Sequence, residues 1–200
     1  YNGLTDFDPS LIALNGAIRS GENYASEDVP CEAALMTALN EAIEAGAALK
    51  DAGSNDAEAN TAATAAINSA ILAVKASRDA YAKFNEFLEG TLAETIAKYE
   101  EGDLSDFSSS LADERDNYTT AYEDGDYTTE QINEIVSGFA ARVKTAVQEK
   151  LAEIAGDGQA HNLDISVIFD NLTFDNRNTA GWTAGQLTSG KFESQQNGVA

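Results

Sequence analysis

The fold of this chain is decided by residues 57–101, AEANTAATAAINSAILAVKASRDAYAKFNEFLEGTLAETIAKYEE. Apolar side chains recur in this stretch every three or four positions, a spacing that places them on one face of an α-helix. They are Ile67, Ile71, Val74, Tyr81, Phe84, Leu88, Leu92, Ile96 and Tyr99. Gly90 is the one interior helix breaker, and a single glycine costs only about 1 kcal/mol in a helix. The stretch therefore predicts one long helix, continuous or gently bent.

Two shorter helices are expected before the long one. Pro9 marks the start of the first, which is expected to end near Gly21. Pro30, together with the aspartate two residues before it, opens the second, which Gly53 ends. Asn55, followed three residues later by a glutamate, has the spacing of a capping box, which satisfies free amides at the start of the long helix.

Two further helices are expected after the long one. Asp103 is placed to cap the fourth, which runs to the turn EDGDY, residues 123–127. Thr128 and Gln131 form a capping box for the fifth, which ends at AGDG, residues 155–158. The apolar positions of this last helix have the most regular helical spacing in the chain.

These five helices predict a mainly α fold for residues 1–155. The favoured arrangement is two antiparallel three-helix units that share the long helix, with sub-bundles at about 1–90 and 90–155. One irregular bundle is the alternative. A Gly-rich linker, residues 156–163, then leads to residues 164–200, which are expected to be the start of a β-sandwich.

The charge of the chain limits its partners. Twelve basic and 34 acidic residues give a formal net charge of −22. Such a surface repels polyanions, so neither nucleic acid nor an anionic membrane surface is an expected partner. No apolar run approaches the roughly 20 residues that span a bilayer. Because the sequence starts at Tyr1 and shows no signal peptide, we expect a leader or a larger upstream portion to be missing from this numbering.

The residues do not point to an enzyme. The single cysteine, Cys31, lies among apolar residues and is interpreted as a small buried side chain. The single histidine, His161, lies in the connector GDGQAHNLD, residues 156–164, and is interpreted as a linker residue. Neither a hydrolytic triad nor a di-iron bundle fits one histidine so placed. Paired carboxylates such as Glu123 and Asp124 are interpreted as a solvated face, and the acidic turn there lacks the EF-hand spacing. No cofactor is expected.

In residues 34–71, ALMTALNEAIEAGAALKDAGSNDAEANTAATAAINSAI, an Ala-rich helix, a polar turn and a second Ala-rich helix follow one another. This stretch resembles the FIVAR-type repeats of large bacterial surface and secreted proteins. The resemblance extends over about residues 28–100 and more loosely over 104–155. It implies an extracellular or bacterial cell-surface protein.

The tail has the residue pattern of β-structure. Ile165, Val167 and Phe169 recur at period two, the spacing of side chains on one face of a strand, and NRNTAG, residues 176–181, has the composition of a turn. A motif follows that consists of Thr173, Phe174, Asp175, Asn176, Gly181, Trp182 and Thr183. With this motif, the tail resembles the opening of galactose-binding-like jelly-roll modules of Bacteroidetes surface proteins. Since a jelly roll needs about eight strands, the module is incomplete in this sequence.

The second resemblance implies a carbohydrate-binding-like module. Trp182 would then be a platform for a sugar ring, with Asp175, Asn176 and Arg177 in an adjoining loop. A tryptophan packed between sheets and a plain turn are the structural alternatives. A structural calcium in the module is left open, without an assigned residue. The partners expected are a glycan and either another protein chain or the rest of the module.

Two classes of function follow from these observations. The first is a non-enzymatic helical spacer that carries the β-module for glycan binding or surface display. The alternative is a helical interaction module whose acidic faces dock another protein. An accessory region of a glycan-degrading enzyme is compatible with the first.

Overall fold

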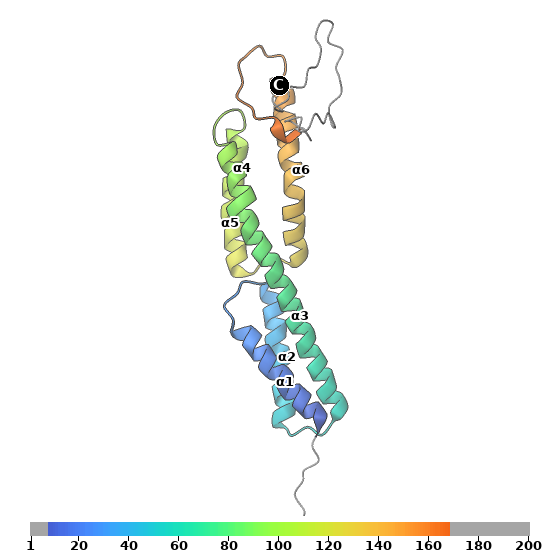
Figure 1. Ribbon diagram of the computed structural model, residues 1–200. Helices are drawn as coiled ribbons and strands as arrows, with labels where there is room; N and C mark the ends of the chain where they lie inside the picture. Colours follow the sequence, from blue (N-terminus) through green and yellow to red (C-terminus); the bar gives the residue numbers. More distant parts are fainter. Residues whose placement is uncertain (1–7, 169–200) are drawn as a thin grey trace, which may run out of the picture. The chain divides into compact units, whose positions relative to one another are not determined.

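The computed structural model describes residues 8–168, which are mainly helical, as the sequence predicts (Figure 1). No strand occurs among these residues. The elements are α1 (Pro9–Ser26), α2 (Ala33–Asp51), α3 (Ala57–Phe87), a π-helical turn η1 (Leu88–Leu92), α4 (Ala93–Lys98), α5 (Ser105–Asp124), α6 (Thr129–Ile154) and a 3₁₀ turn η2 (Ser166–Ile168). None of the described helices has the length and apolarity needed to cross a membrane.

The described chain divides into two compact units. The first unit contains residues 8–94 and 113–137, and the second contains residues 95–112 and 138–168. The predicted long helix is helical throughout, from α3 through η1 to α4, with the π turn placed around Gly90. A π turn inserts an extra residue into the helix without ending it, so this glycine does not break the helix.

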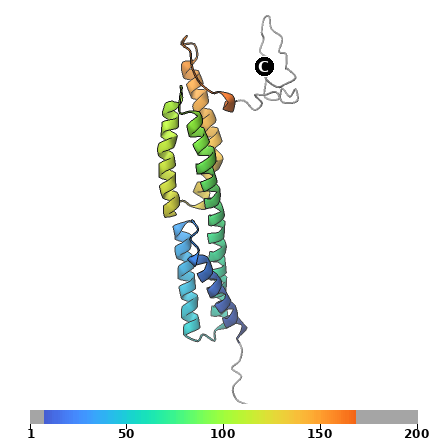
Figure 2. The same ribbon diagram turned by 60° about the vertical axis from the view of Figure 1, so that its left-hand side comes forward.

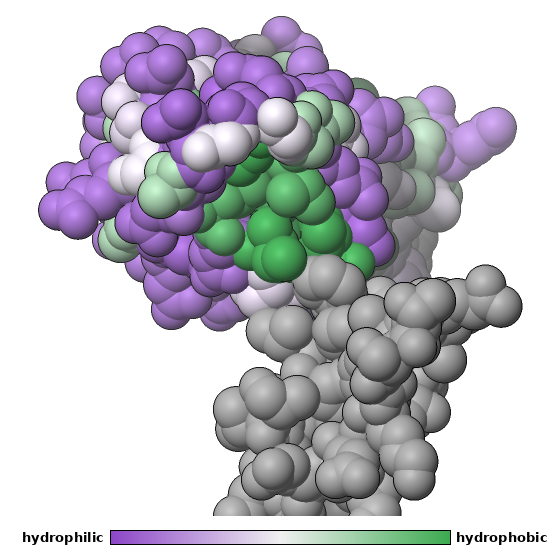
Figure 3. Space-filling model, turned by 90° about the horizontal axis from the view of Figure 1, so that it is seen from above, coloured by the Kyte–Doolittle hydropathy of each residue, from purple (hydrophilic) through white to green (hydrophobic). Residues whose placement is uncertain are grey.

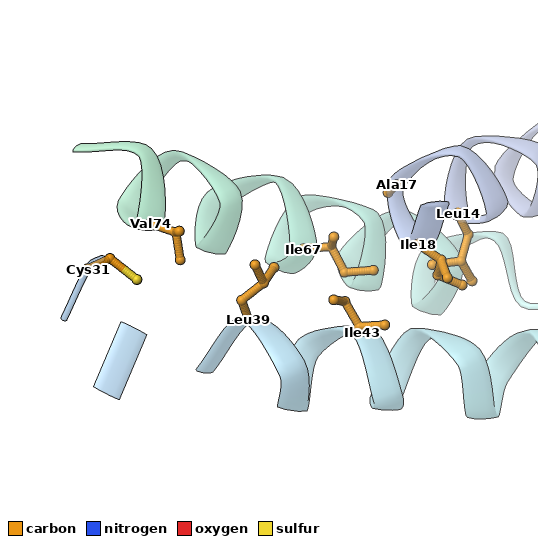
Figure 4. Close-up of a cluster of buried hydrophobic side chains, with 8 residues drawn as sticks. All are labelled: Leu14, Ala17, Ile18, Cys31, Leu39, Ile43, Ile67 and Val74. Atoms are coloured by element: carbon orange, nitrogen blue, oxygen red, sulfur yellow. The ribbon is translucent and has the colours of Figure 1, made fainter. Parts of the chain in front are cut away.

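In the first unit, α1, α2 and α3 lie side by side, with α2 antiparallel to its two neighbours (Figures 1 and 2). Their apolar faces meet in a common core because apolar residues recur every three or four positions in each helix. Figure 4 shows this core converging from the three helices and the α1–α2 loop. Its buried members are Leu14, Ala17, Ile18, Cys31, Leu39, Ile43, Ile67 and Val74.

The first helix does not end near Gly21, which corrects the prediction: α1 continues to Ser26. Gly21 is buried, and a Cβ built on it would lie 2.8 Å from Ile43 Cγ1. A Cβ on Gly46 of α2 would lie 3.0 Å from Ile67 Cδ1. These glycines therefore allow the helices to approach closely, and packing outweighs their low helix propensity.

Helix starts agree with the sequence in part. Asp8 caps α1 by accepting a hydrogen bond from Ser10 N at 2.8 Å. The box at α6 is confirmed, since Thr128 N donates to Gln131 Oε1 and Gln131 N donates to Thr128 Oγ1.

Two helix starts were predicted at the wrong residue. The cap of α3 is Asp56, one residue after the predicted Asn55, and its Oδ1 accepts from the amides of Glu58 and Ala59, both at 3.0 Å. The second helix starts at Ala33, later than the Pro30 signal, because residues 28–32 form the end of the α1–α2 loop.

A second cluster in the first unit is aromatic. It contains Tyr81, Phe84, Phe87, Tyr118, Tyr122 and Tyr127. The hydroxyl of Tyr81 donates to Tyr127 O at 2.8 Å and accepts from Tyr127 N at 3.1 Å. Burial raises the pKa of Tyr81 to about 12, which keeps the hydroxyl protonated and able to donate.

The second unit combines the end of α4, the start of α5 and most of α6. Its buried apolar side chains are Tyr99, Leu104, Leu111, Phe139, Val143 and Val147. Ser108 of α5 donates from Oγ to Ile96 O of α4 at 2.7 Å, which ties these two elements together.

The predicted β-segment is not present in the part that the structure describes. Residues 166–168 form the turn η2 where a strand through Ile165 and Val167 was expected. The physical reason is local, because Asp164 Oδ1 accepts from Ser166 N at 2.8 Å and draws the backbone into a turn. Residues 169–200 lie outside the described residues, and so do Asp175, Asn176, Arg177 and Trp182.

Candidate functional site

The candidate site is the connector, residues 156–164, together with the 99–104 turn between α4 and α5. Both belong to the second unit. The connector has the composition of a flexible linker, but its polar side chains and backbone bond to the helical unit. Three groups of contacts hold it: an Asp–His–Asp cluster, a backbone pair, and a lysine–aspartate ion pair.

The Asp–His–Asp cluster is centred on His161. Its Nδ1 lies 3.0 Å from Asp103 Oδ1, and its Nε2 lies 2.9 Å from Asp157 Oδ2. The imidazole side chain is 23% exposed. A neutral imidazole has one N–H, so only the doubly protonated ring donates to both carboxylates. The geometry therefore favours the imidazolium form.

The electrostatics of the cluster agree with this protonation state. Hydrogen bonds with Asp103 and then Asp157 raise the pKa of His161. The hydrogen bond from His161 lowers the pKa of Asp103, and the backbone amide of Gln159, followed by His161, lowers that of Asp157. An opposite charge or a donor at hydrogen-bond distance favours the ionised carboxylate, which is the cause of both shifts.

The backbone pair lies next to the histidine. Asn162 N donates to Asp103 Oδ2 at 2.7 Å, and Asp103 N donates to Asn162 O at 3.3 Å. Gly102 makes this approach sterically possible: its φ is +91°, and a Cβ built on it would lie only 2.4 Å from Asn162 O. A glycine is required at this position both by its φ angle and by the closeness of the connector.

The ion pair holds the end of the connector. Lys98 Nζ lies 2.9 Å from Asp164 Oδ2 and donates to Ser166 Oγ at 3.0 Å. The hydroxyl of Tyr99 donates to Asp164 O at 3.4 Å. Each contact is small in energy because the groups are partly exposed. Together with the cluster and the backbone pair, they fix the path of the chain from α6 to residue 166.

The chemistry of the cluster is that of a clamp. Both ring nitrogens of His161 face carboxylates, so neither is available to take a proton from a nucleophile in this arrangement. Cys31 is a free thiol buried in the core of the first unit, as predicted, and burial raises its pKa, which keeps it protonated and unreactive. Within residues 8–168, no three His, Cys, Asp or Glu side chains converge to hold a metal ion.

Sequence reasoning placed two of the site residues but missed their roles. Asp103 was predicted to cap α5, whereas its carboxylate binds His161 and Asn162 N. His161 was interpreted only as a linker residue. The signal that was available is the spacing of Asp157 and His161, four residues apart. The partner from the 99–104 turn is 58 residues away and had no sequence signal.

No protein-family model, curated protein or solved structure matches this chain. The FIVAR-type and galactose-binding-like resemblances therefore stay predictions.

The protection of the connector amides from hydrogen exchange is expected to fall as the pH rises through the raised pKa of His161. A raised pKa in the folded chain means that the contribution to stability is present below the ordinary value of 6.5 and is lost at higher pH. The two aspartates have lowered pKa values and stay ionised through this range. Hydrogen exchange of the Asn162 amide, corrected for its intrinsic pH dependence, measures the effect between about pH 5.5 and 8.5.

The control for this experiment is His161→Gln. The variant lacks the titrating group, so its corrected exchange rate is expected to be flat over the same range. An identical pH profile in the two proteins would contradict the role of the imidazolium.

Proposed function

We propose that the chain is a non-enzymatic helical spacer that holds a carbohydrate-binding-like β-module for glycan binding or surface display. In this proposal, two three-helix units share the long helix, and the β-sandwich begins after the connector. The observation that carries the proposal is the docked connector. A spacer needs a defined point of exit for the module that it carries, and the contacts of residues 156–166 supply one.

The connector is held by more contacts than its linker-like composition suggests. Segments rich in glycine and small polar residues behave as flexible coils when nothing holds them. Here the carboxylate of Asp103 alone receives both the imidazole of His161 and the amide of Asn162. Ordering a backbone residue costs about 1–2 kcal/mol, so a segment of this length stays ordered only where several contacts offset that cost. The arrangement supports a function in which the direction of the following chain matters.

Apolar surface near the end of the connector is consistent with a module placed there. Ile165, Val167 and Ile168 are only half-buried. Figure 3 shows hydrophobic side chains gathered on part of the face seen from above, with hydrophilic ones along part of their edge. Apolar surface of this kind is stabilised when another part of a protein covers it.

The glycan part of the proposal rests on the resemblance of the tail. In it, Trp182 supplies a stacking platform, and Asp175, Asn176 and Arg177 supply hydrogen bonds to sugar hydroxyls. The proposed location is extracellular or on a bacterial cell surface. A glycan array probed with a protein that contains a complete module tests this part of the proposal. The supporting result is that the protein binds a sugar and that Trp182→Ala abolishes this binding. If the array retains no sugar, the glycan-binding part of the proposal is wrong, and only the spacer part stands.

The spacer part is tested by substituting Gly102 with alanine. The new Cβ would lie 2.4 Å from Asn162 O, so the connector must move away from the 99–104 turn. This movement disturbs the backbone pair and the cluster together. We expect the exchange of the Asn162 amide to accelerate by about tenfold or more, because a hydrogen bond and its alignment are lost.

The matched control for this variant is Gly156→Ala. Gly156 has a similar φ of +83°, but nothing lies within 4 Å of a Cβ built on it. It introduces the same backbone strain without the steric block, so the Asn162 amide should stay protected. Equal acceleration in both variants would show that the contacts of Asp103 with His161 and Asn162 do not hold the connector.

A further inference from the structure

An open depression lies in the first unit between the α1–α2 loop, the start of α2 and the α5–α6 turn. Its volume is about 390 Å³. The end of α1 contributes Ala25, the loop contributes residues 27–31, α2 contributes residues between Ala33 and Asn40, and the end of α5 with the first residue of the turn after it contributes residues 123–125. We call this depression the acidic groove. Pockets of a few hundred cubic ångströms accommodate several side chains or a small ligand.

The lining of the acidic groove includes exposed apolar surface. Val29 is 45% exposed, one of four large hydrophobic side chains that are exposed among the described residues, and it lines the groove together with Pro30 and Met36. Burying such a side chain against a partner is favourable in proportion to the apolar area removed from water.

The rim of the acidic groove carries negative charge only. Its carboxylates are Glu27, Asp28, Glu123 and Asp124, and no lysine, arginine or histidine lines it. Arg78 lies behind the loop, where its guanidinium is buried and binds Glu27 and the carbonyl of Tyr24. Asp28 and the two carboxylates at the end of α5 line the groove and are exposed, so they are the ones available to an incoming ligand.

The walls of the groove are held together before any ligand binds. Ala33 N donates to Gly125 O at 2.9 Å, which joins the start of α2 to the α5–α6 turn. Glu32 N donates to Ser77 Oγ of α3 at 2.9 Å. A preformed site loses less conformational freedom on binding.

We propose that the acidic groove binds a segment of a partner protein in which lysine or arginine side chains flank an aliphatic one. The aliphatic side chain covers Val29, and the cations face the rim. We choose this partner because its charge complements that of the groove. The negative potential of the groove attracts cations and repels nucleic acid and acidic peptides. A single metal ion does not fit, since no three carboxylates or thiols among the described residues converge on one point.

The probe for this proposal is a fluorescein-labelled peptide of the repeating pattern Lys-Leu-Leu-Lys, followed by fluorescence anisotropy with the full chain. Two control peptides replace every lysine by glutamate or every leucine by serine. Binding of the first peptide alone is the supporting result. Equal binding of the serine peptide would show attraction to the net charge only and would overturn the proposal.

A charge reversal locates the binding. The double variant Glu123→Lys with Asp124→Lys is expected to weaken binding of the peptide by about tenfold, because two carboxylates of the groove are replaced by cations that repel its lysines. The matched control is Glu41→Lys with Glu44→Lys on exposed positions of α2 that do not line the groove. Both variants change the net charge equally. An equal loss of binding in the two would overturn the groove as the site.

A substitution of Val29 tests the apolar part of the lining. Val29→Ser is expected to weaken binding by about fivefold, from the lost apolar contact. Leu72→Ser is the control, because Leu72 is 67% exposed on α3 and does not line the groove. Both residues are exposed in the free protein, so circular dichroism should show the same helix content in both variants. Unchanged binding by Val29→Ser would contradict the proposal.

Discussion

Replacement of Ile67 by alanine is expected to lower the free energy of unfolding of the first unit by about 2–5 kcal/mol, the range for truncating a fully buried aliphatic side chain. Ile67 has no exposed surface and lies where α1, α2 and α3 meet. Its methyl groups fill the space beside Gly21 and Gly46, which have no side chains that could move into the cavity. The cavity would therefore stay largely open, which places the effect in the upper part of this range.

Urea unfolding followed by circular dichroism measures this change, with Leu72→Ala as the matched control. Leu72 lies on the same helix, five residues further on, and is 67% exposed. Its truncation is expected to change the unfolding free energy by no more than about 0.5 kcal/mol. Comparable losses in the two variants would mean that Ile67 is not the contact point of the three helices.

The helices could be predicted because each signal is local. The spacing of apolar residues in 57–101, the start signal at Pro9 and the cap at Thr128 depend only on neighbours within one or two turns. Gly21 was misread for the opposite reason. Whether a glycine ends a helix or admits a neighbouring helix depends on what packs against it, and Ile43 comes from a helix that follows in sequence.

The candidate site could be predicted only in part, for the same physical reason. Asp157 and His161 are close in sequence, and their pairing follows from a turn. Asp103 is joined to them only when α5 and α6 have packed, since 58 residues separate it from His161. A carboxylate just before a helix usually caps that helix. The carboxylate of Asp103 instead makes tertiary contacts with the connector.

The connector also shows why a pattern of alternating residues was insufficient. Ile165 and Val167 have the period of a strand, but a strand needs a partner for its backbone groups. Asp164 offers the amide of Ser166 a nearer acceptor. A local hydrogen bond that forms without a long-range partner prevails over the alternation of side chains at these residues.

Replacement of Gly125 by alanine is expected to lower the free energy of unfolding of the first unit by about 2–4 kcal/mol. About 1–2 kcal/mol comes from placing a side chain at its φ of +72°, and about 1 kcal/mol or more from the hydrogen bond of Ala33 N to Gly125 O. The added Cβ would meet the backbone, 2.6 Å from Cys31 O and 2.9 Å from Ala33 N. Backbone atoms cannot rotate away as a side chain can, so the turn must move.

Gly53→Ala separates the two contributions. Gly53 has a similar φ of +64°, but no atom lies within 4 Å of a Cβ built on it, so only the conformational strain of about 1–2 kcal/mol is expected. The difference between the two variants in urea unfolding then measures the contact between the α5–α6 turn and the start of α2. If both variants lose the same stability, the turn relaxes without cost, and the wall that it gives to the acidic groove is not fixed by Gly125. A larger loss in Gly125→Ala, together with weaker binding of the lysine–leucine peptide, would connect that turn to both the stability of the unit and the shape of the groove.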